Sequence, residues 1–87
     1  MTRSEIRQAL KASDRWGINN QPTLSFMVRI LEVLPVAGIT MTDDATMMLT
    51  LSRPLSGAEA WRLCTKSYAD EPHELKEDQT VIRLWWD

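Results

Sequence analysis

The last stretch of the chain, residues 80–86, constrains the fold more than any other part of the sequence. It reads TVIRLWW, a β-branched and aromatic composition that is typical of a strand. Side chains alternate between the two faces of a strand. One face would carry Ile82, Leu84 and Trp86. The other face would carry Val81, Arg83 and Trp85. A small open sheet uses one face for its core, so the two adjacent tryptophans must meet different surroundings.

Length and composition predict one small globular domain over residues 1–87. Hydrophobic residues make up 44% of the chain and charged residues 25%, a balance that supports a core and argues against disorder. The net charge of −2 provides no overall positive field for nucleic acid, so any basic site would have to be local.

The cysteine content and the first residues of the chain predict the cellular compartment of the protein. A single cysteine, Cys64, excludes an internal disulfide and leaves a structural zinc ion without paired thiolates. The first residues are polar and charged, and no apolar run approaches the ~18 residues of a membrane span. We therefore expect a cytoplasmic protein that has no targeting segment and does not enter a membrane.

Residues 3–16 have the spacing of an amphipathic helix, with Thr2 or Ser4 as its N-cap. Its core-facing positions recur at helical intervals: Ile6, Ala9, Leu10, Ser13 and Trp16. On the opposite side, cations follow one another at intervals of four residues: Arg3, Arg7, Lys11 and Arg15. Successive members of this row drift little around a helix, so the sequence predicts that they form one surface, the basic ridge.

Residues 22–34 admit two interpretations. As a helix, the segment would begin near Pro22, stop before Pro35 and carry its polar residues on one narrow stripe. That stripe consists of Ser25, Arg29 and Glu32. As a strand, its apolar residues alternate, but Glu32 falls among them. Both prolines lie where a helix would begin and end, which favours the helix and keeps the strand as the alternative.

Residues 36–52 change to a period of two, which predicts a β-hairpin with residues 42–46 as its loop. Its core-facing side chains would be Ile39, Met41, Met47, Leu49 and Leu51. A helix should begin after Ser56, because Ser56 and Glu59 match a capping box. Its core face would consist of Ala60, Trp61, Leu63, Cys64 and Tyr68. The sequence thus predicts an α+β fold with a small three-stranded, mostly antiparallel sheet and the order α-α-β-β-α-β.

The sequence contains no arrangement with recognisable catalytic chemistry. Cys64 and His73 are the one possible thiol and imidazole pair, but Cys64 lies on the apolar side of its helix, where a thiol is inert. His73 lies in an acidic connector with Glu71, Glu74 and Glu77, and nothing rigid would hold these groups around a cation. We therefore expect a protein that is not an enzyme and holds no metal and no cofactor.

The basic ridge offers one hypothesis for function, a DNA-binding regulator. Cations on a helix can follow phosphates, and two helices followed by a hairpin loosely resemble a winged helix. Three features argue against it. The connection between the helices is long for a helix-turn-helix, the second helix is apolar, and the hairpin loop carries Asp43 and Asp44 where phosphates would favour cations. DNA binding through this ridge is therefore the alternative function.

Trp85 offers the other hypothesis. If the helix over residues 3–16 packs on the second face of the sheet, it covers Val81 and Trp85. If it does not, Val81, Arg83 and Trp85 stay open, and Met48 on the neighbouring strand extends the patch. An aromatic residue beside an arginine is typical of protein-interface hot spots. The leading hypothesis is a small regulator of inhibitor, anti-repressor or adaptor type that binds another protein, or a second copy of itself, in a bacterial or bacteriophage cytoplasm.

Overall fold

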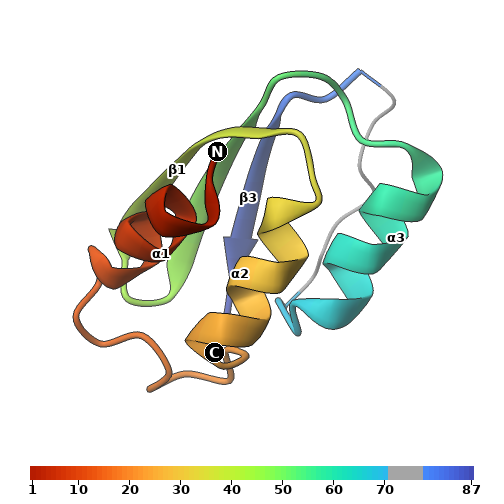
Figure 1. Cartoon of the computed structure of the whole chain (residues 1–87). Helices are drawn as coiled ribbons and strands as arrows, with labels where there is room; N and C mark the ends of the chain where they lie inside the picture. Colours follow the sequence, from red (N-terminus) through yellow and green to blue (C-terminus); the bar gives the residue numbers. More distant parts are fainter. Residues whose placement is uncertain (71–77) are drawn as a thin grey trace.

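The computed structural model of the chain describes residues 1–70 and 78–87 (Figure 1). Its helices are α1 (Arg3–Lys11), α2 (Leu24–Glu32) and α3 (Gly57–Lys66). Its strands are β1 (Val36–Asp43), β2 (Thr46–Leu51) and β3 (Val81–Trp85). The α+β class and the order α-α-β-β-α-β are confirmed, and the ambiguous segment 22–34 forms a helix rather than a strand.

A capping box fixes the start of α1. The Thr2 hydroxyl accepts a hydrogen bond from the Glu5 backbone N–H at 3.1 Å, and the Glu5 carboxylate accepts one from the Thr2 N–H at 2.8 Å. These bonds satisfy two of the N–H groups that a helix leaves without partners at its start. Thr2, rather than Ser4, is therefore the N-cap of this helix.

The predicted continuation of this helix to residue 16 is wrong, because other hydrogen bonds guide the chain after α1. The buried Ser13 hydroxyl donates to Asp44 Oδ1 at 2.7 Å. The indole N–H of Trp16 donates to the Pro22 carbonyl oxygen at 3.0 Å. Both bonds hold residues after Lys11 against other parts of the fold, so these residues do not continue the axis of α1.

Helix α2 provides a large share of the core. The Thr23 hydroxyl caps it by accepting a hydrogen bond from the Phe26 N–H at 3.3 Å. Its buried side chains are Met27, Val28, Ile30 and Leu31. Its polar stripe lies on the other side, where Ser25 and Arg29 are exposed and Glu32 is half-buried. This division is the one expected of an amphipathic helix.

The sheet has the order β1-β2-β3, and both strand pairs are antiparallel. The hairpin turn between β1 and β2 is held by the Asp43 carboxylate, whose Oδ1 accepts a hydrogen bond from the Ala45 N–H at 2.7 Å. The register places Leu49 opposite both Ile39 and Ile82, which aligns the core-facing side chains of the three strands. The predicted core face of the hairpin is confirmed.

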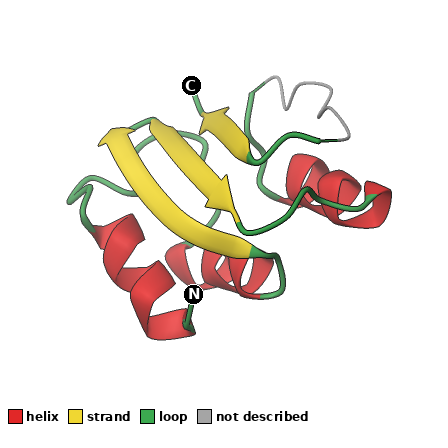
Figure 2. Ribbon diagram, turned by 90° about the horizontal axis from the view of Figure 1, so that it is seen from above, coloured by secondary structure: helices red, strands yellow, loops and turns green. Residues whose placement is uncertain are grey.

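The helices and the sheet form two layers. Helices α1 and α2 lie side by side on one face of the sheet, and α3 lies beside α2 (Figures 1 and 2). Ile6 and Leu10 of α1 are fully buried between α2 and β1. The interpretation in which the first helix covers the second face of the sheet is therefore wrong. Among the described residues no helix covers the face that carries Trp85, which is the outer face of the sheet (Figure 2).

The predicted core face of α3 is only partly correct. Leu63 is buried, but Trp61 is 63% exposed and Tyr68 is 61% exposed. Helix α3 packs against α2 at the side of the molecule, so it needs only a narrow apolar strip. After its end, Tyr68 adopts a left-handed conformation with φ of 56°, which reverses the chain direction and leaves Ala69 buried instead.

Trp86 follows β3 directly and is almost completely buried. Its indole N–H donates to the Ser67 carbonyl oxygen at 2.7 Å, and its ring meets the Trp16 ring edge to face at a centroid distance of 5.5 Å. Its backbone N–H donates to the Ala45 carbonyl oxygen at 2.9 Å. Trp86 thus joins the end of α3, the segment after α1 and the hairpin turn.

We predict that Trp86→Phe lowers the free energy of unfolding by about 2–3 kcal/mol, because it leaves a small cavity and removes the hydrogen bond to the buried Ser67 carbonyl. The control Trp61→Phe should change this free energy by less than about 0.5 kcal/mol, since Trp61 is exposed. Urea unfolding followed by circular dichroism measures both values. Equal losses in the two variants would contradict this account of the core.

An ion pair reinforces the start of α3. The Ser56 hydroxyl accepts a hydrogen bond from the Glu59 N–H at 3.2 Å, which confirms the capping box. Arg53 donates two hydrogen bonds, of 2.8 and 3.0 Å, to the carboxylate oxygens of Glu59. These bonds and the one from the Ser56 backbone N–H lower the pKa of Glu59 from its ordinary 4.5 to about 2.

The depressed pKa predicts how Glu59 affects stability in acid. The ionised carboxylate stabilises the fold above pH 4.5, and this contribution is lost as the pH falls from 4.5 to about 2. In Glu59→Gln the free energy of unfolding should therefore depend less on pH over this range than in the wild type. The exposed Asp14 provides the control Asp14→Asn. Urea unfolding at a series of pH values tests the prediction, and an unchanged pH dependence in Glu59→Gln would refute it.

Candidate functional site

The side chains predicted to bind a partner lie together on the outer face of the sheet, which is turned away from α1 and α2 (Figure 2). They are Met48, Val81, Arg83 and Trp85, which we call the outer-face patch. Arg83 lies opposite Met48 in the register of β2 and β3. Val81 and Trp85 lie two positions to either side of Arg83 on the same face of β3. The structure therefore brings all four residues into one surface.

The outer-face patch is accessible to a partner. Val81 is 48% exposed and Arg83 is exposed, while Met48 and Trp85 are half-buried. The neighbouring positions on the same face are the exposed Thr40 beside Met48, the exposed Thr50 beside Val81 and the buried Thr46 beside Trp85. The exposed threonines are too short to cover Val81 and Met48. The sheet thus presents an apolar centre with a polar border, the arrangement of a protein interface.

The segment after α3 holds the backbone of Trp85 from the side opposite β2. The Asp70 N–H donates to the Trp85 carbonyl oxygen at 2.7 Å, and Asp70 Oδ2 accepts a hydrogen bond from the Asp87 N–H at 2.7 Å. Trp85 therefore presents its indole from a fixed backbone, which would reduce the entropy lost if a partner bound there. No local pattern in the sequence marks this role of Asp70, because the contact joins segments that are distant in the chain.

Arg83 provides the charge of the outer-face patch. The ion pairs found in residues 1–70 and 78–87 involve other arginines, so no described carboxylate neutralises Arg83. A planar guanidinium binds carboxylates through two parallel hydrogen bonds and stacks on aromatic rings. The patch is therefore complementary to a surface that offers a carboxylate beside apolar groups.

The structure divides the predicted basic ridge. Arg3 donates hydrogen bonds of 2.8 and 3.0 Å to the two carboxylate oxygens of Glu32 on α2. Arg15 lies beyond the end of α1, and its guanidinium is 3.3 Å from Asp44 Oδ2. Arg7 and Lys11 remain on α1 with no ion pair to another described residue. The ridge thus offers a phosphate backbone fewer free charges than the sequence suggested.

Arg7 of α1 lies close to Ser25 and Arg29 of α2, a proximity that no sequence pattern predicted. The structure places the three around a shallow hollow between α1 and α2, together with Arg3 and Val28. The sequence does show the polar stripe on α2 and the row of cations on α1. It does not show that the two helices pack against each other along these lines, because that depends on how both meet the sheet.

The other residues considered as candidates for chemistry are Cys64, Asp43, Asp44 and the acidic connector. Burial raises the pKa of the half-buried Cys64 thiol, which disfavours the reactive thiolate. Asp43 and Asp44 bond to the hairpin turn and to the segment after α1. Four members of the acidic connector lie outside the described residues: Glu71, His73, Glu74 and Glu77. The described part of the chain contains no group of at least three acidic, cysteine or histidine residues that could hold a metal ion.

Comparison with protein-family models, with curated proteins and with solved structures gives no match to this chain. No helix within residues 1–70 and 78–87 is long and apolar enough to cross a membrane.

The geometry predicts opposite roles for two adjacent residues of β3. Ile82 is 2% exposed on the core side, so Ile82→Ala should lower the free energy of unfolding by about 2–4 kcal/mol. Val81 is 48% exposed on the outer face, so Val81→Ala should lower it by less than about 1 kcal/mol. Guanidinium unfolding measures both values. Similar losses in the two variants would show that the outer face is covered.

Proposed function

We propose that this chain is a non-catalytic domain that regulates another protein by binding it through the outer-face patch. The observation that supports this most strongly is the asymmetry of the sheet. Helices cover one face, while the other presents the exposed Val81, the half-buried Trp85 and an Arg83 that no described carboxylate neutralises. Arginine and aromatic residues contribute most of the binding energy in many interfaces.

The chemistry of the patch specifies the surface that it would bind. Trp85 and Val81 favour an apolar depression on the partner, because burying their exposed area removes it from water. Arg83 favours a carboxylate at the border of that depression. The partner is therefore a folded protein with an acidic group next to an apolar site, as an inhibitor, anti-repressor or adaptor would recognise.

We propose a cytoplasmic setting, since a lone cysteine such as Cys64 is typical of a reducing compartment, and a bacterial or bacteriophage source, which a small, simple domain favours. The proposal requires no metal, cofactor or membrane. The competing hypothesis remains a DNA-binding regulator that uses the basic ridge, and the experiment below separates the two.

The proposal is tested first by crosslinking and then by affinity. A photo-crosslinking amino acid at position 81 should form a covalent product with one protein in nuclease-treated bacterial lysate at ~150 mM salt, where weak surface charge is screened. With that partner purified, Trp85→Ala should weaken binding by roughly 30-fold or more, the loss typical of a hot spot. Arg83→Glu should weaken it further at low salt, since it places like charges together.

The control is Trp61→Ala, which removes an exposed indole from α3 and leaves the sheet unchanged. It should alter the dissociation constant by less than about twofold. Circular dichroism confirms that each variant is folded. Loss of binding in Trp61→Ala and retention in Trp85→Ala would refute the proposal.

Two other outcomes would support different functions. If the captured partner is lost after nuclease treatment, and its affinity falls steeply between ~50 and ~200 mM salt, the result would support the DNA-binding alternative. Crosslinking only to a second copy would identify a homodimer interface and contradict a separate partner.

A further inference from the structure

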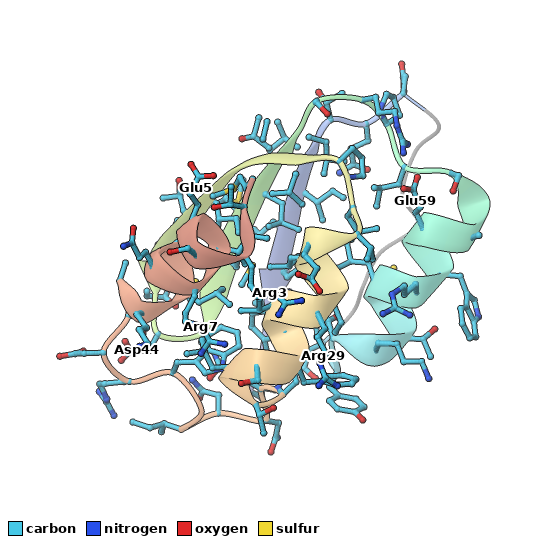
Figure 3. The ribbon with its side chains drawn as sticks, in the orientation of Figure 1. Arg3, Glu5, Arg7, Arg29, Asp44 and Glu59 are labelled. Carbon is cyan, nitrogen blue, oxygen red and sulfur yellow. The ribbon has the colours of Figure 1, made fainter. Side chains whose placement is uncertain are left out.

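A second surface on the helix side of the molecule gathers three arginines around the hollow between α1 and α2 (Figure 3). Arg3 and Arg7 come from consecutive turns of α1, and Arg29 comes from α2. Ser25 lies one turn before Arg29 and adds a hydroxyl, while Val28, which is buried, forms the apolar floor. The hollow has a volume of about 170 Å³, which is sufficient for one small ion with water. We call it the α1–α2 hollow.

The α1–α2 hollow has an excess of positive charge. Glu32 binds Arg3 through two hydrogen bonds, which lower the pKa of Glu32, and the charges of Arg3 and Arg29 lower it further, so this carboxylate is ionised. Arg7 is half-buried, and neither Arg7 nor Arg29 forms an ion pair with a described carboxylate. Three positive groups thus lie near one negative group at an open surface, where the Arg3 side chain is 67% exposed and Arg29 is also exposed. The like charges repel one another, and a bound anion would offset this repulsion.

We infer that the α1–α2 hollow binds a single phosphate-type oxyanion, either free phosphate or the phosphoryl group of a monoester. Arginine guanidiniums donate paired hydrogen bonds that match the oxygens of such an ion, and the Ser25 hydroxyl donates one more. A tetrahedral ion directs oxygens towards both helices, whereas a planar carboxylate would satisfy one guanidinium. Glu32, which binds Arg3 and does not itself line the hollow, repels a continuing chain of phosphates, and this favours one ion over a nucleic-acid backbone. Helices α1 and α2, whose residues line the hollow, lie on the opposite face of the sheet from the outer-face patch (Figure 2), so this site is independent of the function proposed above.

The first test is a titration of the whole chain with inorganic phosphate, followed by nuclear magnetic resonance. Signals of the Arg7 and Arg29 side-chain N–H groups should shift with phosphate and reach saturation. The same ionic strength supplied as sodium chloride should not produce this response, because chloride lacks several oxygens to bridge the helices. No saturable shift with phosphate, or an equal shift with chloride, would overturn the inference.

The second test compares variants. Arg7→Gln and Arg29→Gln should each raise the dissociation constant for phosphate by roughly tenfold, the loss expected for one charge-assisted contact. Lys11→Gln is the matched control, because Lys11 is an exposed cation on α1 that does not line the hollow. It should change the constant by less than about twofold, since a distant exposed charge is screened. Unchanged affinity in the double variant Arg7→Gln with Arg29→Gln would refute the site even if phosphate binds the chain elsewhere.

The third test separates the sources of the ion. Phenyl phosphate that binds more tightly than inorganic phosphate would identify a monoester as the ligand, and the reverse order would identify free phosphate. A short DNA duplex tests nucleic acid as the competing class of ligand. If the duplex binds through Arg7 and Arg29, and Lys11→Gln weakens it as much as Arg7→Gln does, α1 follows a nucleic-acid backbone and the single-ion inference is wrong.

Discussion

The burial of Trp86 is the interaction on which the rest of this structure depends. One residue bonds to Ser67 through its indole, contacts Trp16 with its ring and bonds to Ala45 through its backbone. It therefore connects the end of α3, the segment after α1 and the tip of the hairpin. Side chains alternate along β3, where Ile82 and Leu84 are buried, so Trp85 at the end of the strand faces the outer side while Trp86 directly after it is buried in the core.

The arrangement of the helices has two further consequences. Helix α1 buries Ile6 and Leu10 on the same face of the sheet that α2 covers, which leaves the outer face without a helix in the described chain. The same packing sets the cations of α1 beside the polar stripe of α2, so that Arg7 and Arg29 share one hollow. The two surfaces lie on opposite sides of the sheet. We therefore propose that a protein partner and a small anion use different faces of the domain.

Sequence patterns correctly predicted the parts of the fold that depend on interactions between residues close together in the chain. Alternation along residues 80–86 gave the orientation of β3, and the capping box at Ser56 gave the start of α3. The patterns were wrong where contacts between residues far apart in the chain determine the structure. Apolar residues on α3 suggested a core face that included Trp61, but α3 packs at the side of the molecule and leaves it exposed. The position of Arg29 in a hollow likewise depends on helix packing, which no local pattern contains.

The claim that one face of the sheet is open can be tested directly with a soluble gadolinium chelate, which broadens the resonance signals of accessible groups. The adjacent Met47 and Met48 provide the comparison, because Met47 is fully buried in the core and Met48 lies on the outer face. The account predicts that the chelate broadens the methyl signals of Met48 and Val81 and leaves those of Met47 and Ile82 sharp. Equal protection of Met48 and Met47 would show that the outer face is covered and would contradict the proposed binding surface.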